Sequence, residues 1–581
     1  MNRPNVLMFA VDDYRDFVGC LATHPDVKTP NIDRLAKGGV TFNNTHCQAP
    51  MCGPSRASLL SGIRPSTSGC YGFQPMRSID MLAKAATIPK HFRINGYHVM
   101  GTGKVHHGKP KMGHGPHQSE WDEYWPSINE PLINFNGEIH EVQQSGKVNF
   151  TFGISDTPEA ECGDAQHAQW AVKQLEKDFS QPFFLGVGFY RPHLPFICPR
   201  KYFDLYDREK LTAVLVNDDD LADIPDAGRY LSNYIVDDLI RDRNLQLDIL
   251  HAYLACVSYM DAQVGVVLNA LENSSYRDNT VVLFWSDNGW HFGEKLTWKK
   301  FTLWKEATRV PLIISAPGMS KGKMSTKPVG LIDIYPTLLD LCNLPQPSQK
   351  LEGRSLRPLL EQPNQEWPYG VVTTHGRDSH CVTTERWKYI KYFDDSEELY
   401  DRGNDTYEWI NLATEESHSE IKQELKNWLP DINVPNAPGS TLAAYFSTDY
   451  PDLQKWRKNK AKWKEERGEI TEAIELYLDT IQLEEQSPLW VYRRLGNLLI
   501  KDNQIDKAIK VLEKATSVHT DNPGIPKLYI LLGRAYDKNN QSKKTIDNFQ
   551  KAISLDPKQP QWIYKKISSI KDQELAVSAN A

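Results

Sequence analysis

The sequence predicts an α/β domain, followed by a smaller α+β subdomain and an all-α repeat domain. In residues 1–345, short apolar strands alternate with helical stretches, which is the pattern of a large, mainly parallel sheet between helices. In residues 346–440, short β-prone runs follow one another closely. In residues 463–581, a helical pattern recurs about every 35 residues. A chain of 581 residues is long enough for about three to four such parts.

Five apolar runs are the predicted strands of the α/β domain. They are rich in Val, Leu, Ile and Phe and are bounded by turn residues or helical stretches, as buried strands are. The predicted strands cover residues 5–11, 97–101, 183–189, 281–285 and 311–315.

The predicted subdomain has a different pattern. Residues 371–374, 381–384 and 387–392 indicate a short antiparallel meander. After it, the chain is irregular and then strongly charged, so we interpret residues 441–462 as a linker that leads into the repeat domain, residues 463–581.

The repeat domain contains small residues and prolines at a regular spacing. Ala473 and Ala508 occupy matching places, and Thr545 holds the next one. This period, with small residues inside helix pairs, resembles tetratricopeptide repeats, and a plain helical bundle with accidental spacing is the alternative. Such a stack offers a surface for a protein partner or for a second copy of the chain, whereas a passive stabilising role is the other interpretation. The matching prolines are Pro488, Pro523 and Pro557.

Composition excludes several classes of protein. A formal net charge of −7 argues against a nucleic-acid or anionic-membrane surface. We expect no membrane span, because no apolar run is long enough, and we find no secretory leader. The chain is thus expected to be cytoplasmic, or periplasmic or secreted if a leader was removed, and the repeats suggest a bacterial origin. Nine cysteines without a C-x-x-C pair indicate buried thiols.

Polar side chains follow four of the predicted strands at the point where each strand ends. Asp12-Asp13 follow the first strand, Lys104 the second, His193 the third and Asp287-Asn288 the fourth. Parallel sheets bind ligands beyond the carboxyl ends of their strands. If these strands are parallel neighbours, the four groups meet at one edge of the sheet.

The acidic members of this set favour a metal site. Asp12, Asp13, Asp287 and Asn288 offer oxygen ligands only, which suit Ca²⁺ or Mg²⁺. Zinc is disfavoured because no His or Cys cluster has zinc spacing. Taken one at a time, each Asp is equally explained as a cap of the next helix or turn.

A second group consists of cationic or titrating side chains. They are useful where negative charge develops on a leaving oxygen, because a positioned acid and fixed cations lower that barrier. A single exposed Lys or His usually has no such role, so these candidates count only as a group: Lys104, His106, His107, His193 and Lys300.

The pentapeptide that begins at Cys52 and ends at Arg56 matches C-x-P-S-R. With Thr102-Gly103-Lys104 and the segment 398–412, it makes residues 1 to about 430 resemble a type I sulfatase of the alkaline-phosphatase superfamily. Segments 11–15, 103–107, 191–196 and 285–294 are most similar to iduronate-2-sulfatases. A buried cysteine in a turn before a helix is the bland alternative for Cys52 alone.

The resemblance implies a mechanism. Cys52 would be oxidised to formylglycine by a formylglycine-generating enzyme, and the hydrated aldehyde would supply the nucleophile. One calcium ion would be held by Asp12, Asp13, Asp287, Asn288 and modified Cys52, although iduronate-2-sulfatases usually have His at the place of Asn288. Arg56, Lys104 and His193 would hold the sulfate, and His193 or Lys300 would protonate the leaving alcohol. Two ambiguities remain: His107 is preferred over His106, and Lys300 over Lys299.

The substrate implied by the resemblance is a sulfated sugar, such as a 2-O-sulfated uronic acid in a glycosaminoglycan or in ulvan. Candidate sugar contacts, each equally explained by ordinary packing, are Arg191, Trp290, His291, His375, Arg377 and His380. Two other functions compete with a sulfatase. One is a phosphoester or phosphonate hydrolase of the same superfamily, and the other is an inactive sulfatase-like domain whose repeats recruit partners.

Overall fold

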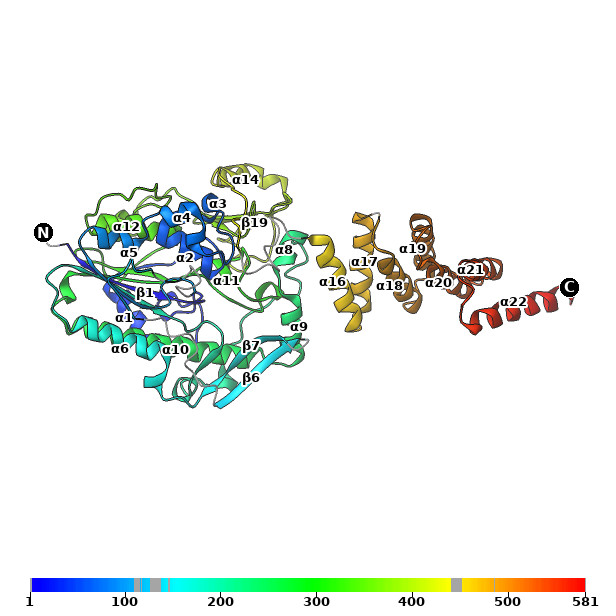
Figure 1. Ribbon diagram of the computed structural model, residues 1–581, viewed down its shortest axis with the longest axis horizontal. Helices are drawn as coiled ribbons and strands as arrows, with labels where there is room; N and C mark the ends of the chain where they lie inside the picture. The colour runs from blue at the N-terminus through cyan, green and yellow to red at the C-terminus, as the bar shows by residue number, and fades with distance from the viewer. Residues whose placement is uncertain are drawn as a thin grey trace. The chain divides into compact units, whose positions relative to one another are not determined.

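The computed structural model describes residues 3–108, 115, 117–125, 137–144, 147–439, 452–484 and 486–579. The chain divides into two compact units, Met1–Pro451 and Asp452–Ala581 (Figure 1). The predicted α/β domain and α+β subdomain both belong to the first unit, and the helical repeats form the second.

The first unit is built on an eight-stranded sheet with the order β14-β2-β13-β10-β1-β8-β4-β5. The neighbours β10, β1, β8, β4 and β5 are parallel, and β13 joins β10 in the antiparallel direction. The mainly parallel sheet predicted from the sequence is therefore confirmed. The strands are β1 (Asn5–Val11), β2 (Val40–Phe42), β4 (His98–Gly103), β5 (Glu123–Trp125), β8 (Phe183–Phe189), β10 (Thr280–Ser286), β13 (Leu312–Ser315) and β14 (Lys323–Ser325).

Helices cover both faces of this sheet (Figure 1). Successive side chains of β1 point to opposite faces, so Leu7 and Phe9 belong to one hydrophobic cluster while Val6 and Met8 belong to another. Burying each of these side chains contributes about 1.5–3 kcal/mol. The first face is covered by α1 (Pro30–Gly38), α6 (Gly163–Leu175) and α10 (Gln246–Glu272), and the second by α2 (Cys52–Ser61), α5 (Ile88–Ile94) and α12 (Ile334–Leu341).

Helix α10 differs from the expectation that no apolar run could span a bilayer. By length and composition it is the one such candidate among the described residues, but 78% of its most apolar window is buried. Its residues Leu250, Tyr253 and Val257 belong to the first hydrophobic cluster. Within the unit, α10 is a core helix.

The α+β subdomain contains the predicted meander. Its four strands form an antiparallel sheet in the order β16-β17-β18-β19, with Val382 opposite Tyr389 and Tyr389 opposite Leu399. These three side chains are buried against α14 (Ser419–Lys426). The strands are β16 (Val371–Thr374), β17 (His380–Thr383), β18 (Trp387–Lys391) and β19 (Glu397–Asp401).

Three smaller sheets complete the strands of this unit. One joins β6 (Gly137–Gln144), β7 (Lys147–Ser155) and β9 (Phe196–Pro199), one pairs β11 (His291–Phe292) with β12 (Trp298–Lys299), and one pairs β3 (Thr45–His46) with β15 (Val329–Gly330). The remaining helices are α3 (Pro65–Ser68), α4 (Asp80–Lys84), α7 (Arg200–Phe203), α8 (Asp226–Leu231), α9 (Tyr234–Asp242), α11 (Lys305–Thr308) and α13 (Arg357–Glu361).

The second unit is all-helical, as the repeat pattern predicts. Small residues let neighbouring helices approach closely: a Cβ atom on Gly496 would lie 2.5 Å from Leu512, and one on Gly533 would lie 2.4 Å from Phe549. The helices are α16 (Leu453–Glu466), α17 (Ile470–Leu483), α18 (Leu489–Lys501), α19 (Ile505–Val518), α20 (Ile525–Lys538), α21 (Ser542–Leu555) and α22 (Gln561–Ala579).

The predicted linker, residues 441–462, requires a correction. Residues 441–451 lie outside the described part of the chain, but 453–462 form most of α16, which belongs to the second unit. The charged run conceals an amphipathic helix, because Trp456 and Ala461 are buried while Lys462 lies on the exposed side.

Candidate active site

The carboxyl ends of four parallel strands meet at one edge of the main sheet. Val11 of β1 lies opposite Ser286 of β10 and Phe189 of β8, and Gly103 of β4 lies opposite Gly188. The polar residues that follow these strands are thereby brought together. Ligand atoms of four of the predicted residues lie within 4.8 Å of one another: Asp12, Asp13, Cys52 and Asp287.

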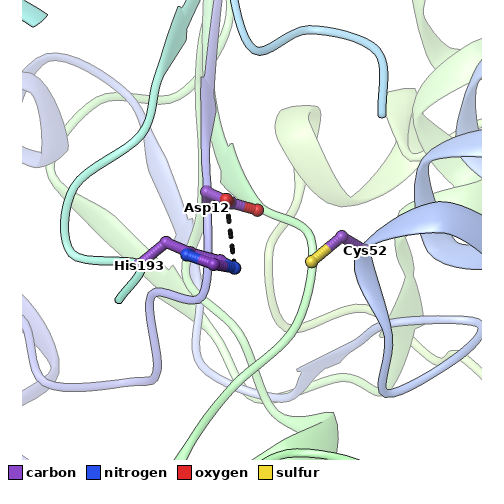
Figure 2. A group of neighbouring side chains, drawn as sticks. All are labelled: Asp12, Cys52 and His193. Atoms are coloured by element: carbon purple, nitrogen blue, oxygen red, sulfur yellow. Dashed lines mark ion pairs between the residues drawn. The ribbon is translucent and has the colours of Figure 1, made fainter. Parts of the chain in front are cut away.

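Cys52 is the first residue of α2, and its side chain faces Asp12 and His193 (Figure 2). Pro54 is tolerated in the first helical turn, where backbone N–H groups have no helical acceptor. The helix ends at Gly62, whose φ of 73° is left-handed and whose N–H donates to Ser58 O at 2.8 Å. The unmodified thiol donates to Asp13 Oδ1 at 3.5 Å. Burial, reinforced by Asp12, raises the pKa of Cys52 well above its usual value.

Arg56 lies one turn further along α2 and joins two of the carboxylates. Its Nε donates to Asp287 Oδ2 at 2.7 Å and its Nη2 to Asp12 Oδ1 at 3.2 Å, with all three side chains buried. Burial alone would raise the pKa of Asp12, but Lys104, His193 and Arg56 hold it well below the usual value. The pKa of Asp287 rises to about 7, because burial and the neighbouring carboxylates outweigh Arg56. The carboxylates of the cluster are thus close enough to affect one another's ionisation.

Asp13 has a constrained backbone. Its φ is 54°, in the left-handed region that non-glycine residues seldom adopt. Two hydrogen bonds fix it there: its N–H donates to Asp287 Oδ1 at 3.1 Å, and its carbonyl accepts from the Tyr253 hydroxyl at 3.0 Å. Asn288 Nδ2 donates to Asp13 Oδ1 at 2.8 Å. These bonds hold the Asp13 carboxylate beyond the carboxyl end of β1, beside the other site residues.

These residues fit a hard divalent cation. Two buried oxygens, Asp13 Oδ2 and Asn288 Oδ1, have no hydrogen-bond partner among the described residues. Buried oxygens without donors are costly, and a cation ligated by oxygen would satisfy them. The three carboxylates are balanced by three cations, so a divalent ion would give the site the net positive charge that suits an anionic ester. The groups counted are Asp12, Asp13 and Asp287 against Arg56, Lys104 and Lys300.

His193 approaches the cluster from the loop between β8 and β9. Its Nδ1 donates to the Leu194 carbonyl at 2.6 Å, which leaves Nε2 facing Asp13 Oδ2 at 3.4 Å and Asp12 Oδ2 at 3.9 Å (Figure 2). Burial lowers the pKa of His193, and Asp13 opposes that shift. About a third of the side chain is exposed, so the ring can meet a ligand from solvent.

Lys104 follows β4 and forms an ion pair with Asp12. The strand end is shaped by two glycines: φ at Gly103 is 70°, and a Cβ atom there would lie 1.9 Å from Gly188 O. Only glycine allows this close approach. The Lys104 ammonium also lies 5.6 Å from the centre of the Tyr190 ring.

The two adjacent histidines have different surroundings. His106 is buried, its Nε2 accepts from Trp121 Nε1 at 3.2 Å, and burial lowers its pKa to about 4. His107 is only partly buried and stacks on Phe73 with ring centres 4.6 Å apart. Phe73 itself packs over Gly53, the residue after Cys52. This geometry favours His107 as the member that faces a ligand.

The two adjacent lysines are also distinguished. The Lys300 ammonium donates to Cys52 Sγ at 2.7 Å and forms an ion pair with Asp13. Lys299 has a different contact, with its ammonium 5.1 Å from the centre of the Phe150 ring. The structure therefore places Lys300, as preferred from the sequence, beside the cysteine.

Most of the predicted sugar contacts belong to the core. Arg191 is buried and donates from Nε to Ile197 O at 2.8 Å, so it holds the His193 loop. His291 is buried and bonded to Thr302 Oγ1 at 2.7 Å. Trp290 and His380 are likewise buried, whereas His375 and Arg377 are partly exposed. Burial therefore favours the ordinary-packing interpretation for these four residues.

Sequence reasoning missed the residues that support the site. Asp164, near the start of α6, accepts from the N–H groups of Tyr190 and Arg191 at 2.9 Å each, which fixes the loop that carries His193. Ser55 Oγ donates to Asp287 O at 2.6 Å. A signal existed only for Ser55, which lies inside the C-x-P-S-R motif.

Comparison with known proteins agrees with this geometry. The family model described as "Sulfatase" matches residues 4–344, and that of "N-sulphoglucosamine sulphohydrolase, C-terminal" matches residues 293–434. The family model described as "Tetratricopeptide repeat" matches residues 491–521 and 526–559.

Individual proteins and solved structures that are similar to this chain agree with the family models. A protein named "Sulfatase" from Formosa agariphila is 37% identical over 456 residues, which cover 75% of this chain and 88% of that protein. The mouse "Iduronate 2-sulfatase" is 33% identical over 396 residues, 59% of this chain and 69% of that protein. A phosphonate monoester hydrolase from Silicibacter pomeroyi has a TM-score of 0.63 at 21% identity over 73% of this chain and 94% of that chain, a likeness of fold alone. The chain therefore belongs to the sulfatase family and carries a C-terminal tetratricopeptide-repeat region.

Proposed function

We propose that this sulfatase is calcium-dependent, that its nucleophile is Cys52 oxidised to formylglycine, and that its substrate is a sulfated uronate-containing sugar. The observation that carries the proposal is the position of Cys52. It begins a buried helix and lies within 4.8 Å of the oxygens of Asp12, Asp13 and Asp287. Three carboxylates beside a neutral thiol have no evident role, whereas carboxylates that bind a metal ion next to an oxidised Cys52 would have one.

Calcium bound by Asp12, Asp13, Asp287 and Asn288 would supply a fixed positive charge beside the sulfate. The aldehyde of modified Cys52, once hydrated, would supply a hydroxyl nucleophile and a second hydroxyl through which sulfate is released. The net reaction is hydrolysis: the ester and water give the free alcohol and sulfate.

The chain's own residues then have distinct tasks. Arg56 is anchored to Asp12 and Asp287 and stays close to the Cys52 side chain, so it orients the nucleophile and offsets negative charge. Lys104 adds positive charge beside Asp12, and Lys300 adds it beside Asp13. These fixed cations are already in place before the substrate binds, which avoids reorganisation during the reaction.

His193 is the group best placed to protonate the leaving oxygen. Its Nδ1 donates to Leu194 O, so Nε2 is the nitrogen that faces the site. The ring can give up a proton from Nε2 only as the imidazolium, the form that the neighbouring Asp13 and Asp12 carboxylates favour against the effect of burial. Because about a third of its side chain is exposed, it stands between the buried cluster and solvent, where the alcohol departs.

The substrate class rests on the relatives and on the partly exposed rim of the site. The mouse relative is named for iduronate 2-sulfate, and the chain is 33% identical to it. Lys104 and His193, which lie beside Asp12, are partly exposed cationic or titrating groups, which suit an acidic sugar. Phe73 and Tyr190 add partly exposed aromatic surfaces for a sugar ring.

The first test is the mass of the tryptic peptide 38–56 from protein co-expressed with a formylglycine-generating enzyme. It contains Cys47 as well as Cys52, so fragmentation provides an internal control. We expect the aldehyde at Cys52 only. The same protein should release sulfate from a 2-O-sulfated uronate disaccharide, and Cys52→Ala should abolish this release. A Cys52 that stays a thiol in active protein would refute the proposed nucleophile, whereas activity on a phosphonate monoester alone would refute the substrate class.

A further inference from the structure

The β11–β12 hairpin has an unusual backbone next to the proposed nucleophile. Lys299 lies opposite His291 in the two-strand pairing. The φ angles of Lys299 and Phe301 are 79° and 77°, in the left-handed region that residues with side chains seldom adopt. Between them, Lys300 contacts Cys52. Strained backbone of this kind clusters at functional sites, so both lysines deserve a functional explanation.

Lys299 differs from the buried lysines of the same unit. It is partly buried, yet it has no carboxylate partner among the residues that the structure describes. Four other lysines, whose side chains are at most 10% exposed, each have one. Those pairs are Lys104 with Asp12, Lys300 with Asp13, Lys295 with Asp220 and Lys388 with Glu408.

The surroundings of Lys299 disfavour an unneutralised charge. The Phe150 ring, whose centre lies 5.1 Å from the ammonium, attracts the charge weakly. Burial followed by repulsion from Lys300 nevertheless lowers the pKa of Lys299 to about 8. A bound anion would reverse both effects, because it replaces lost hydration and opposes the neighbouring positive charge. The site lacks such an anion within the described residues, so a ligand is the natural source.

Lys299 also lies near the residue that contacts Cys52, since, after burial, repulsion from the Lys300 ammonium is one cause of the lowered pKa of Lys299. The Phe150 ring meets the Trp290 ring edge-on with centres 6.2 Å apart, and the Lys300 ammonium lies 6.0 Å from the Trp290 ring centre. Each of the two ammonium groups therefore lies near one member of the same pair of aromatic rings.

We propose that Lys299 binds a second anionic group of the substrate, a carboxylate or a second sulfate on the sugar that carries the scissile sulfate. The inference rests on the proposed function and deepens it, since it makes Lys299 the residue that selects acidic sugars over simple sulfate esters. In this proposal Lys300 contacts the sulfate that is cleaved, and Lys299 contacts the second anionic group of the same sugar.

Contact with an aromatic ring does not explain Lys299 by itself. Lys28 has the same interaction, with its ammonium 4.9 Å from the centre of the Tyr206 ring, and it achieves this at an exposed position with an ordinary surface backbone. Lys28 contacts none of the residues assigned to the active site. It is therefore a matched control: a lysine over an aromatic ring without the strained turn and without the neighbouring Lys300.

The test compares Lys299→Met, Lys299→Arg and Lys28→Met on three substrates: a 2-O-sulfated uronate disaccharide, its carboxyl-reduced form and 4-methylumbelliferyl sulfate. We expect Lys299→Met to raise KM for the acidic disaccharide at least tenfold with little change in kcat. It should leave the aryl sulfate unchanged. Lys299→Arg should restore most of the affinity, and Lys28→Met should behave as the parent. Equal losses on all three substrates would overturn the proposal. So would the absence of any loss both on these substrates and on a disulfated, carboxyl-reduced disaccharide.

The substrate arms also identify the anion. If the carboxyl-reduced disaccharide is insensitive to Lys299→Met, the partner is the carboxylate. If a disulfated, carboxyl-reduced disaccharide regains the sensitivity, the partner is a second sulfate. Calorimetric binding of the acidic disaccharide to Cys52→Ala, with and without Lys299→Met, separates this inference from the proposed function. At least tenfold weaker binding supports the Lys299 contact even if no sulfate is released, and unchanged binding refutes it even in an active enzyme.

Discussion

The ammonium of Lys300 lies 2.7 Å from the sulfur of Cys52 and is also ion-paired with Asp13. The contact joins a residue of the β12 turn to the first residue of α2, two segments that are far apart in the sequence. The Asp13, Cys52 and Asp12 side chains raise the pKa of Lys300 above its usual value despite its burial. Lys300 is therefore a permanent positive charge at the reacting position.

Lys300→Ala is expected to lower kcat by about 10²–10⁴-fold, the usual range for a positioned charged or acid–base group. The effect should fall on kcat more than on KM, because the charge acts where the ester bond breaks. Steady-state kinetics on a sulfated disaccharide provides the measurement. Lys305→Met is the control, since that partly buried ammonium bonds to the Thr406 carbonyl and pairs with Glu306 instead of contacting Cys52. If both variants keep parental kcat, Lys300 has no role in the reaction.

Removal of calcium is expected to abolish activity and to lower the stability of the first unit. A ligand at 100 times its Kd stabilises the folded state by about 2.7 kcal/mol, and the unpartnered oxygens of Asp13 and Asn288 are the groups that would lose by its removal. Denaturant unfolding with chelator and with added calcium measures the difference.

Asp13→Asn should remove the stabilisation by calcium against denaturant, while nearly preserving the shape of the side chain. Asp340→Asn is the matched control, because that carboxylate pairs with Arg357 at the surface at 3.1 Å. A parent protein whose unfolding is insensitive to calcium would contradict the assignment of the metal site.

The sequence predicted the centre of the site because two simple patterns coincide there. Apolar runs such as Asn5–Val11 and Phe183–Phe189 fix the strands, and in a parallel sheet the polar residues after them must share an edge. Asp12, Lys104 and His193 could be placed together in this way without any side-chain geometry.

The remaining features could not be predicted in this way. They depend on the direction in which each side chain points, and the sequence pattern does not determine that direction. Arg191 and Trp290 have the residue types expected of sugar contacts, but tertiary packing buries both. The β6–β7–β9 sheet was missed because β6 (Gly137–Gln144) is mostly polar and lacks an apolar run. The start of α16 has the sequence pattern of a linker, because most of its residues are charged and only a few, such as Trp456, are buried and apolar.

Acid is expected to weaken the subdomain through Glu397. Although burial opposes it, hydrogen bonding and ion pairing with Lys426, Tyr389 and Lys422 lower the pKa of Glu397 to about 2. A carboxylate with a lowered pKa stabilises the folded state above its unfolded value, and this stabilisation is lost as the pH falls from about 4.5 to about 2.

The difference in unfolding free energy between the parent and Glu397→Gln should therefore be constant above about pH 5 and shrink below it. Denaturant titrations at several pH values measure this difference. Glu424→Gln, at an exposed position of α14, should show a smaller pH-dependent difference. A difference that grows on acidification would show that the Glu397 contacts do not stabilise the fold.

Replacement of His107 and replacement of His106 are expected to affect different properties, the first kcat and the second the stability of the fold. His107→Ala should lower kcat while leaving the unfolding midpoint close to that of the parent, because His107 is partly exposed and stacks on Phe73 beside the Cys52 turn. His106→Ala should instead destabilise the first unit by about 1–3 kcal/mol, because it leaves the buried Trp121 N–H without its acceptor. Measuring kcat and the denaturant midpoint on both variants gives a two-by-two comparison in which each serves as the control for the other. The reverse pattern, with His106→Ala stable but inactive and His107→Ala active, would make His106 the histidine of the active site.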